Sequence, residues 1–423
     1  MNSKKGGDIA VLKTVFKYKY LFKPAAILAF SVYMLFVSCA QEKPIETTES
    51  KEFSKPISGS ADSPVVWFRT TKTSLPNPAP NKILYKDGKI YIINTLTSSI
   101  STFSVTSATG VLPQKIAIIA GQLDGTVTMY DPENGKFFST DLILKLEDEK
   151  STNIEKGRGV APYDAEFVGD VLYILTSDFM AGVSDILIGS SENGKIELTA
   201  LDRKGLEMPT SINYLEPLSA VVITNSAYSP VDLSYGDASL TLLDASSPKK
   251  PNYIGTVSLK DTACKNPVDV IYSNGIVFVT CAGNYYDILP TTLAIDAKEL
   301  KNLNLNIKAN ISAGGISPQI VKGYIYAVDW NLGVLGFSTT DYSVKYSSSD
   351  SLKLIDDFND EKYGTKYQSA YYLTGYGDRI WVCYLSQKKI VEGYVGDDGS
   401  VEKRKEIDVG KEPCPMTVVS LTL

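Results

Sequence analysis

The sequence predicts an all-β protein folded as a β-propeller, with seven four-stranded blades favoured over six and the ring closed by the C-terminal strand. Three observations predict it. Similar hairpin segments recur along the chain, their spacing is close to fifty residues, and the last residues form one more apolar strand. Four-stranded units of about 40–50 residues that bury their faces against one another are the signature of a propeller.

The composition favours strands over helices. The chain holds 26 Tyr, 31 Gly and 20 Pro among its 423 residues. Aromatic and β-branched residues suit strands, and Gly and Pro suit the tight turns between them. The hydrophobic content of 43% and the charged content of 21% are typical of a globular protein.

The repeat is a short apolar run, a turn rich in Gly, Asn or Asp, and a second run with an aromatic or β-branched residue. Clear copies are KILYKDGKIYIIN, AEFVGDVLYILTSD and VDVIYSNGIVFVTC. Intervals of 27, 55, 49, 56, 48 and 55 residues separate the equivalent positions Tyr91, Ile118, Tyr173, Val222, Phe278, Tyr326 and Trp381. The short interval has two interpretations. Either the second blade lacks a strand, or the copy around Ile118 is the outer strand of the first blade and the ring has six blades.

The C-terminal segment, residues 401–423, reads as an outer strand, a turn and a final apolar strand that we expect to complete the first blade. Closure removes exposed strand edges, which otherwise promote aggregation. A pair of β-sandwiches or a β-helix is the structural alternative. Sandwiches do not need so many similar units, and β-helix repeats are shorter.

Three segments, DGKIYIINTLTSSISTFSV, GTVTMYDPENGK and IDVGKEPCP, resemble the YVTN-type propeller repeat. The likeness is loose and covers most of residues 80–423. It implies the propeller scaffold and no particular activity, because one fold hosts binding proteins, enzymes and assembly factors.

The N-terminus is typical of a secretory signal. Six Lys precede the uncharged run at residues 24–38, which is too short to span a membrane comfortably. The segment LFVSC, ending at Cys39, resembles the bacterial lipobox, although Phe36 stands where the family usually has Leu. We therefore expect a lipoprotein signal peptide at residues 1–38, a flexible tether at 39–64 that starts with the lipidated Cys39, and the propeller at 65–423.

An uncleaved N-terminal anchor is the alternative, and both interpretations place the body outside the cytoplasm. Ala40, rather than Asp, follows Cys39. In lipoproteins of this type an Asp there often signals retention at the inner membrane. The expected location is therefore the outer membrane where the organism has one, and otherwise the cell surface.

The other cysteines, Cys264, Cys281, Cys383 and Cys414, permit two disulfides in any of three connectivities. Cys264 and Cys281 flank a predicted hairpin whose Asn-Gly turn lies near their midpoint, which favours a disulfide between them. Four unpaired cysteines remain the alternative. Whether Cys383 pairs with Cys414 is open.

Several classes of function are excluded by composition. The chain has no His, so His-based catalytic and zinc sites are absent. After residue 38 there are 36 basic and 47 acidic side chains, and this acidic body argues against nucleic-acid binding. The acidic stretch at residues 356–362 lacks the offsets of an EF-hand and is read as a solvated loop. No cofactor, metal or catalytic residue is expected.

Two long loops between second and third strands, at residues 226–237 and 282–292, and the equivalent offset in the next blade form the candidate ligand site. Loops of this kind emerge on one face and carry function. Aromatic rings beside carboxylates and amides suit a sugar or an aromatic-rich protein contact. The predicted site comprises Tyr228, Asp232, Tyr235, Asp237, Asn284, Tyr285, Tyr286, Asp287, Asp329, Trp330 and Asn331.

Two functional hypotheses follow. The favoured one is a cell-envelope lipoprotein that serves as a non-enzymatic binding or assembly module for a protein or glycan. The other is a carboxylate- or calcium-dependent lactonase, hydrolase or lyase that acts on a sugar, since carboxylate, Lys and Tyr chemistry does not need His.

Overall fold

The fold was examined in a computed structural model, and the prediction of an all-β propeller is confirmed. The residues that the structure describes are 67–69, 80–95, 99–107, 115–121, 126–131, 136–137, 144–153, 162–178, 183–192, 195–201, 204–229, 234–285, 287–362, 364–408 and 413–420. Cys39 and the expected signal and tether, residues 1–64, lie outside them.

Six four-stranded antiparallel sheets, here called blades 1 to 6, follow one another along the chain. Blade 1 contains β2 (Pro80–Lys86), β3 (Lys89–Asn94), β4 (Ser99–Ser107) and β8 (Leu144–Asn153). Blade 2 contains β9 (Pro162–Val168), β10 (Val171–Asp178), β11 (Val183–Glu192) and β12 (Lys195–Ala200). Blade 3 contains β13 (Pro209–Leu215), β14 (Ala220–Asn225), β17 (Ser239–Asp244) and β18 (Asn252–Ser258).

Blades 4 to 6 repeat this pattern. Blade 4 contains β19 (Pro267–Ser273), β20 (Ile276–Cys281), β21 (Thr291–Asp296) and β22 (Ile307–Ile311). Blade 5 contains β23 (Ile316–Val321), β24 (Tyr324–Asp329), β25 (Gly333–Ser338) and β26 (Val344–Tyr346). Blade 6 contains β29 (Ala370–Tyr376), β30 (Arg379–Tyr384), β31 (Lys389–Val395) and β32 (Val401–Asp408).

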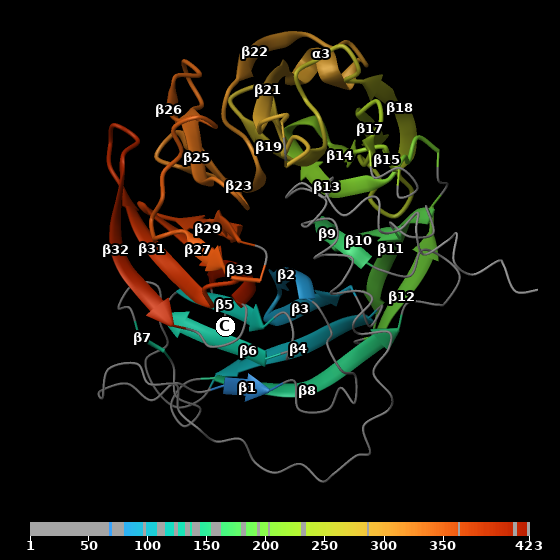
Figure 1. The fold of residues 1–423 in the computed structure, drawn as a ribbon. Helices are drawn as coiled ribbons and strands as arrows, with labels where there is room; N and C mark the ends of the chain where they lie inside the picture. Colours follow the sequence, from blue (N-terminus) through green and yellow to red (C-terminus); the bar gives the residue numbers. More distant parts are fainter. Residues whose placement is uncertain are drawn as a thin grey trace, which may run out of the picture.

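A seventh, five-stranded sheet, the closing blade, completes the ring. It contains, from the inside outward, β33 (Pro413–Ser420), β5 (Lys115–Gly121), β6 (Thr126–Asp131) and β1 (Trp67–Arg69), with β7 (Lys136–Phe137) also paired to β6. The first strands of neighbouring blades contact one another all the way round, and β33 contacts both β29 and β2. Figure 1 shows the red β33 beside the teal β5.

The seven positions that the repeat marked as equivalent all lie on the second strand of a sheet. The short 27-residue interval has a different cause from those expected. The chain leaves blade 1 after β4, forms β5, β6 and β7 of the closing blade, and returns for β8. The C-terminal strand accordingly joins the hairpin around Ile118, and not the hairpin around Tyr91.

Local sequence explains the strands and their turns. Asp87–Gly88 and Asn274–Gly275 have positive φ at both residues, the conformation that a two-residue hairpin between twisted strands requires. The first strands of five blades begin with Pro, which is tolerated at the first residue of a strand because no ladder donor is lost there.

The hydrophobic core is divided among the interfaces between blades. One cluster, with Val222, Leu240 and Val279, lies between blades 3 and 4, and another, with Tyr326 and Val391, lies between blades 5 and 6. Such a core holds the ring as one unit, since each blade covers its neighbour. The part of the chain that the structure describes has no helix suited to crossing a membrane.

A disulfide joins Cys264 and Cys281, whose Cα atoms lie 5.5 Å apart. Cys281 ends β20, but Cys264 lies in the loop before β19 rather than on the paired strand. Cys383 and Cys414 are free and buried. The bond therefore ties the entry of blade 4 to its second strand.

Candidate functional site

One end of the ring carries the loops between second and third strands, together with the links that enter each first strand. Ser369 donates its backbone N–H to Trp330 O at 2.8 Å, so the link into blade 6 is bonded to the loop of blade 5. Ala282 N likewise donates to Asn266 O at 2.9 Å within blade 4. These bonds hold the loops at this end in fixed positions.

Aromatic side chains from five blades gather at this end. The group, here called the collar, consists of Tyr163, Tyr235, Tyr285, Trp330 and Tyr371. Burial raises the pKa of Tyr285, and the phenols of Tyr235 and Tyr163, the Asp329 carboxylate and the phenol of Tyr371 add to the effect. Tyr163 of blade 2 and Tyr371 of blade 6 come from blades that do not neighbour blade 4, so their interaction with Tyr285 requires that the three side chains converge toward the axis of the ring.

Other rings support the collar. Trp330 stacks on Tyr367 with ring centroids 5.4 Å apart and meets Tyr371 edge to face at 6.1 Å. Tyr228 in β15 (Tyr228–Ser229) packs on Tyr235 in β16 (Ser234–Tyr235), with centroids 5.2 Å apart. Trp330 and Tyr235 are thus each packed against a ring from outside the collar.

The structure brings together part of the predicted site. Tyr235, Tyr285 and Trp330 belong to the collar, and the amide Nδ2 of Asn331 donates to Tyr285 O at 3.4 Å. Asp329 is buried, and its Oδ1 accepts from the backbone N–H groups of Asn331 and Leu332. Burial nevertheless raises the pKa of Asp329 to about 6.

Other predicted site residues have local roles. Asn284 Oδ1 accepts from the backbone N–H groups of Asp287 and Ile288 and closes the 282–290 loop. Gly283 is required there, because a Cβ would lie 1.9 Å from Ile288 O. Asp237 pairs with Lys260 at 2.9 Å on an exposed rim. Asp232 and Tyr286 lie outside the described residues.

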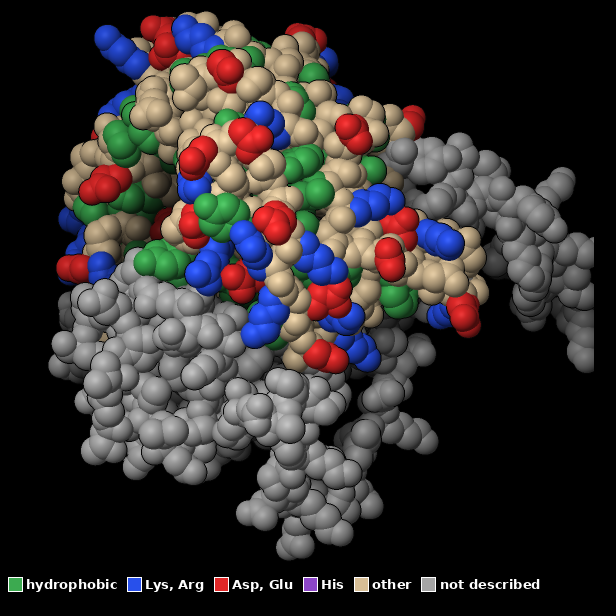
Figure 2. All heavy atoms as spheres, turned by 90° about the vertical axis from the view of Figure 1, so that its left-hand side faces the viewer, with side chains coloured by type: hydrophobic (Ala, Val, Ile, Leu, Met, Phe, Trp, Pro, Cys, Tyr) green, Lys and Arg blue, Asp and Glu red, His purple; other side chains and the backbone are tan. Residues whose placement is uncertain are grey.

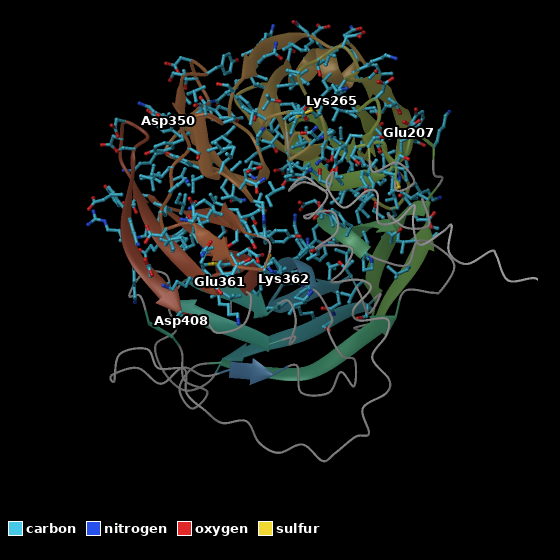
Figure 3. All side chains as sticks on the ribbon, in the orientation of Figure 1. Glu207, Lys265, Asp350, Glu361, Lys362 and Asp408 are labelled. Atoms are coloured by element: carbon cyan, nitrogen blue, oxygen red, sulfur yellow. A yellow bond between two sulfur atoms is a disulfide. The ribbon has the colours of Figure 1, made fainter. Side chains whose placement is uncertain are left out.

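The expected solvated loop at residues 356–362 is instead largely a hairpin, with β27 (Phe358–Asp360) paired to β28 (Thr365–Tyr367). Asp357 pairs with Lys353 at 2.9 Å and accepts from Gln368 Nε2 at 2.8 Å. In Figure 3 the tip of the β27–β28 hairpin, with Glu361 and Lys362, lies on the inner side of the ring, whereas Glu207 and Asp408 lie at the outer edge. Within the described ranges no group of acidic or cysteine side chains could hold a metal ion.

A second group, which the sequence did not suggest, lies on the first strands. This axial cluster consists of Lys82, Asp164, Glu166, Asp269 and Tyr372. Lys82 Nζ lies 2.9 Å from Asp164 Oδ1, and the second carboxylate oxygen of Asp164 accepts from Ile212 N of blade 3 at 3.0 Å. The Lys82 and Asp164 side chains remain 20% and 11% exposed, so solvent reaches both.

The charges of the axial cluster perturb one another. The pKa of Lys82 is raised well above its usual value, because the pull of Asp164, Tyr372, Asp269 and Glu166 outweighs the opposing effect of burial. Burial raises the pKa of Asp269 to about 7, even though Lys82 and a hydrogen bond from Asn213 favour its charged form. The pKa of Glu166 is also raised, chiefly by burial. Negative charge in the cluster is therefore incompletely balanced.

A signal for this cluster existed in the sequence. In blades 1, 2, 4 and 6 a bulge follows the first residue of the first strand, and the next paired residues are Lys82, Asp164, Asp269 and Tyr372. Aligning the repeats on their initial Pro would have placed three charged residues at one position. A charged residue at an otherwise apolar strand start is unusual enough to suggest a site.

On the face near β32, the described side chains form no single-sign patch of the kind that binds nucleic acid (Figure 2). Figure 2, viewed from the side of β32, shows acidic and basic side chains interspersed. Lys389 and Lys403 both pair with Glu406 there.

No protein-family model matches the chain, and none of the curated proteins matches it. Among solved structures, a Bacteroides fragilis protein named as a "putative 6-phosphogluconolactonase" is 13% identical, with a TM-score of 0.46 over 86% of this chain and all of that one. Apo AztD from Citrobacter koseri is 11% identical, with a TM-score of 0.38 over 81% of this chain and 89% of that one. These likenesses are distant, and the fold assignment rests on the strand topology.

Proposed function

We propose that this chain is a lipid-anchored cell-envelope protein whose propeller is a non-enzymatic binding module for a protein or glycan. The ligand would contact the end of the ring that carries the collar. Propeller scaffolds serve many functions, so the proposal depends on the site and not on the fold.

The observation that supports this proposal best is the convergence of collar residues from five blades. Tyrosine and tryptophan present an apolar ring and a polar group together, and they recur at sugar sites and at binding hot spots. Two collar residues are also held by neighbouring rings, since Trp330 is stacked on Tyr367 and Tyr235 packs against the tilted ring of Tyr228. A rigid site loses less entropy when a ligand binds.

Replacing Tyr235, Tyr285 and Trp330 together by Ala tests the site. We expect binding to a glycan array and to captured envelope proteins to disappear, while thermal unfolding stays cooperative. A matched control replaces Tyr253 in β18 and Tyr394 in β31, neither of which belongs to the collar, and should bind like the wild type. Retained binding by the triple variant, or turnover of a lactone or glycoside by the wild type, would contradict the proposal.

Anchoring has a separate test. Cys39→Ser should release the propeller from membranes or leave an uncleaved precursor, because the acyl chains attach to that sulfur. Membrane fractionation and the mass of the N-terminal peptide measure this. An unmodified mature N-terminus in the wild type would refute the lipid anchor and leave the binding site unaffected.

A further inference from the structure

We infer that the axial cluster is a saccharide subsite that receives the terminal unit of an uncharged glycan and discriminates against acidic sugars. The inference rests on the proposed function and specifies it, because it selects a glycan over a protein ligand and states the charge class of that glycan.

The cluster residues face the axis. In the ring, blade 4 is separated from blade 1 by blades 2 and 3, and blade 6 from blade 1 by the closing blade. Lys82 of blade 1 nevertheless interacts with Asp269 of blade 4 and with Tyr372 of blade 6. Side chains of blades that do not touch can lie near enough for such an electrostatic interaction only across the axis.

The cluster offers hydrogen-bond donors and acceptors side by side. Lys82 Nζ donates, the carboxylates of Asp164, Glu166 and Asp269 accept, and the Tyr372 hydroxyl can do both. Each sugar hydroxyl is likewise a donor and an acceptor. A mixed set therefore matches neighbouring hydroxyls of one sugar better than it matches an anion or an apolar group.

The backbone orients these carboxylates. Asp269 Oδ1 accepts from Val270 N at 2.8 Å, and Glu166 Oε1 accepts from Phe167 N at 3.0 Å. Asp164 is held by Lys82 and by Ile212 N. Each carboxylate is thus fixed in place before a ligand arrives, which favours selective recognition.

The collar and the cluster are consecutive layers. Tyr163 directly precedes Asp164 on β9, and Tyr371 directly precedes Tyr372 on β29. A sugar that enters past the rings of Tyr163 and Tyr371 meets the polar layer next. Rings above and hydroxyl partners below suit the apolar face and the polar edge of a pyranose.

Charge sets the selectivity. Three carboxyl groups face one ammonium, and burial raises the pKa values of Asp269 and Glu166 although Lys82 favours their anionic forms, so negative charge is costly in this cluster. A carboxylate or phosphate on the ligand would add repulsion in a partly desolvated place. Uronic acids and phosphorylated sugars should therefore bind more weakly than their neutral counterparts.

The experiment compares matched oligosaccharides by calorimetry with the propeller, residues 65–423, after a neutral-glycan array has identified a bound series. For mannose the probes are mannotetraose and tetramannuronate, which differ by the carboxylates. We expect wild type to favour the neutral member at least ~10-fold. Asp269→Asn should lower the affinity for the neutral oligosaccharide about 10- to 100-fold, the range for a hydrogen bond to a charged group. The same variant should also reduce the preference for the neutral over the acidic oligosaccharide.

Tyr372→Phe is the second variant, because it removes one hydroxyl without altering charge and so keeps the test valid if Asp269→Asn unfolds. Asp261→Asn, at an exposed carboxylate outside the cluster, is the matched control and should bind like the wild type. Unchanged neutral-sugar affinity in Tyr372→Phe or in folded Asp269→Asn would overturn the inference, as would a preference for uronates. If no saccharide binds but a protein partner depends on the collar, the inference fails and the proposed function stands.

Discussion

The interface between blades 1 and 2 and the interface between blade 6 and the closing blade each bury an apolar cluster, but polar side chains also pair across the first of them. Between blades 1 and 2, Lys82 pairs with Asp164, and Thr95 Oγ1 donates to Pro162 O at 2.7 Å. Between blade 6 and the closing blade, Trp381, Met416 and Ile119 belong to one apolar cluster. Polar contacts have directions and can serve a ligand, whereas apolar burial is non-directional and suits closure.

The largest expected effect follows from removing the closing strand. Deletion of residues 413–423 takes away the innermost strand of the closing blade, leaves the edge of β5 unpaired and removes the contacts of β33 with β29 and β2. We expect loss of cooperative thermal unfolding by circular dichroism. Deletion of residues 421–423 alone, which leaves β33 intact, is the control. A cooperative transition in the longer deletion would show that closure does not depend on this strand.

The next effect concerns the polar interface. Asp164→Ala should cost about 3–5 kcal/mol in urea unfolding, because it leaves Lys82 without its ion-pair partner and Ile212 N without an acceptor. Asp170→Ala is the control, since Asp170 pairs with Lys86 but is 94% exposed, and it should cost far less than Asp164→Ala. Equal costs would mean that the axial pair contributes no more than a surface pair.

A single substitution in the apolar cluster between blade 6 and the closing blade should lower the free energy of unfolding by less than Asp164→Ala does, and this loss should not depend on salt. Met416→Ala removes buried side-chain atoms from the cluster around Trp381, and we expect a loss of about 2–4 kcal/mol that is the same at low and high ionic strength. By contrast, the free energy of unfolding that Asp164→Ala loses relative to the wild type should depend on salt. If the loss of unfolding free energy in Met416→Ala also depended on salt, the expected difference between the two interfaces would be contradicted.

The smallest effect is a dependence on pH. The folded pKa of Asp269 is raised to about 7, so between its unfolded value near 4 and pH 7 the folded state binds more protons than the unfolded state. Stability from this group is therefore present at low pH and lost as pH rises toward and through 7. The melting temperature of the wild type should therefore fall between pH 5 and pH 8, and in Asp269→Asn this fall should be smaller by ~2 °C. An unchanged slope would assign the decline to other groups, such as Asp329.

Sequence patterns predicted the strands well, because hairpins are local. The Asn274–Gly275 turn and the apolar run after it follow directly from turn chemistry and β propensity. The same reasoning could not foresee that β5 and β6 leave blade 1, since the hydrophobic pattern of a strand does not specify its partner. The expected pairing of the final strand was wrong for that reason.

Only the part of the candidate site that lies in long loops could be predicted from the sequence, because loop length is a local feature. Tyr235, Tyr285 and Trp330 lie in loops whose length is visible in the sequence. The axial cluster depends on bulges that place Lys82 and Asp269 at one level of the ring, and on the meeting of blades far apart in the chain. Such convergence becomes visible only when the ring is assembled.

The composition of the closing blade has a kinetic consequence. Its strands come from three distant parts of the chain, and the pair Thr417 and Ile118 lies about 300 residues apart in sequence. Folding slows as contacting residues become more distant, because the entropy of loop closure is lost before the contact forms. Blades 2 to 6 are built from sequential hairpins and can form before the C-terminal residues are available. The closing blade must wait for those last residues, so the folding chain passes through a stage as an open arc in which the edge of β5 is unpaired, and aggregation is most favoured at that stage.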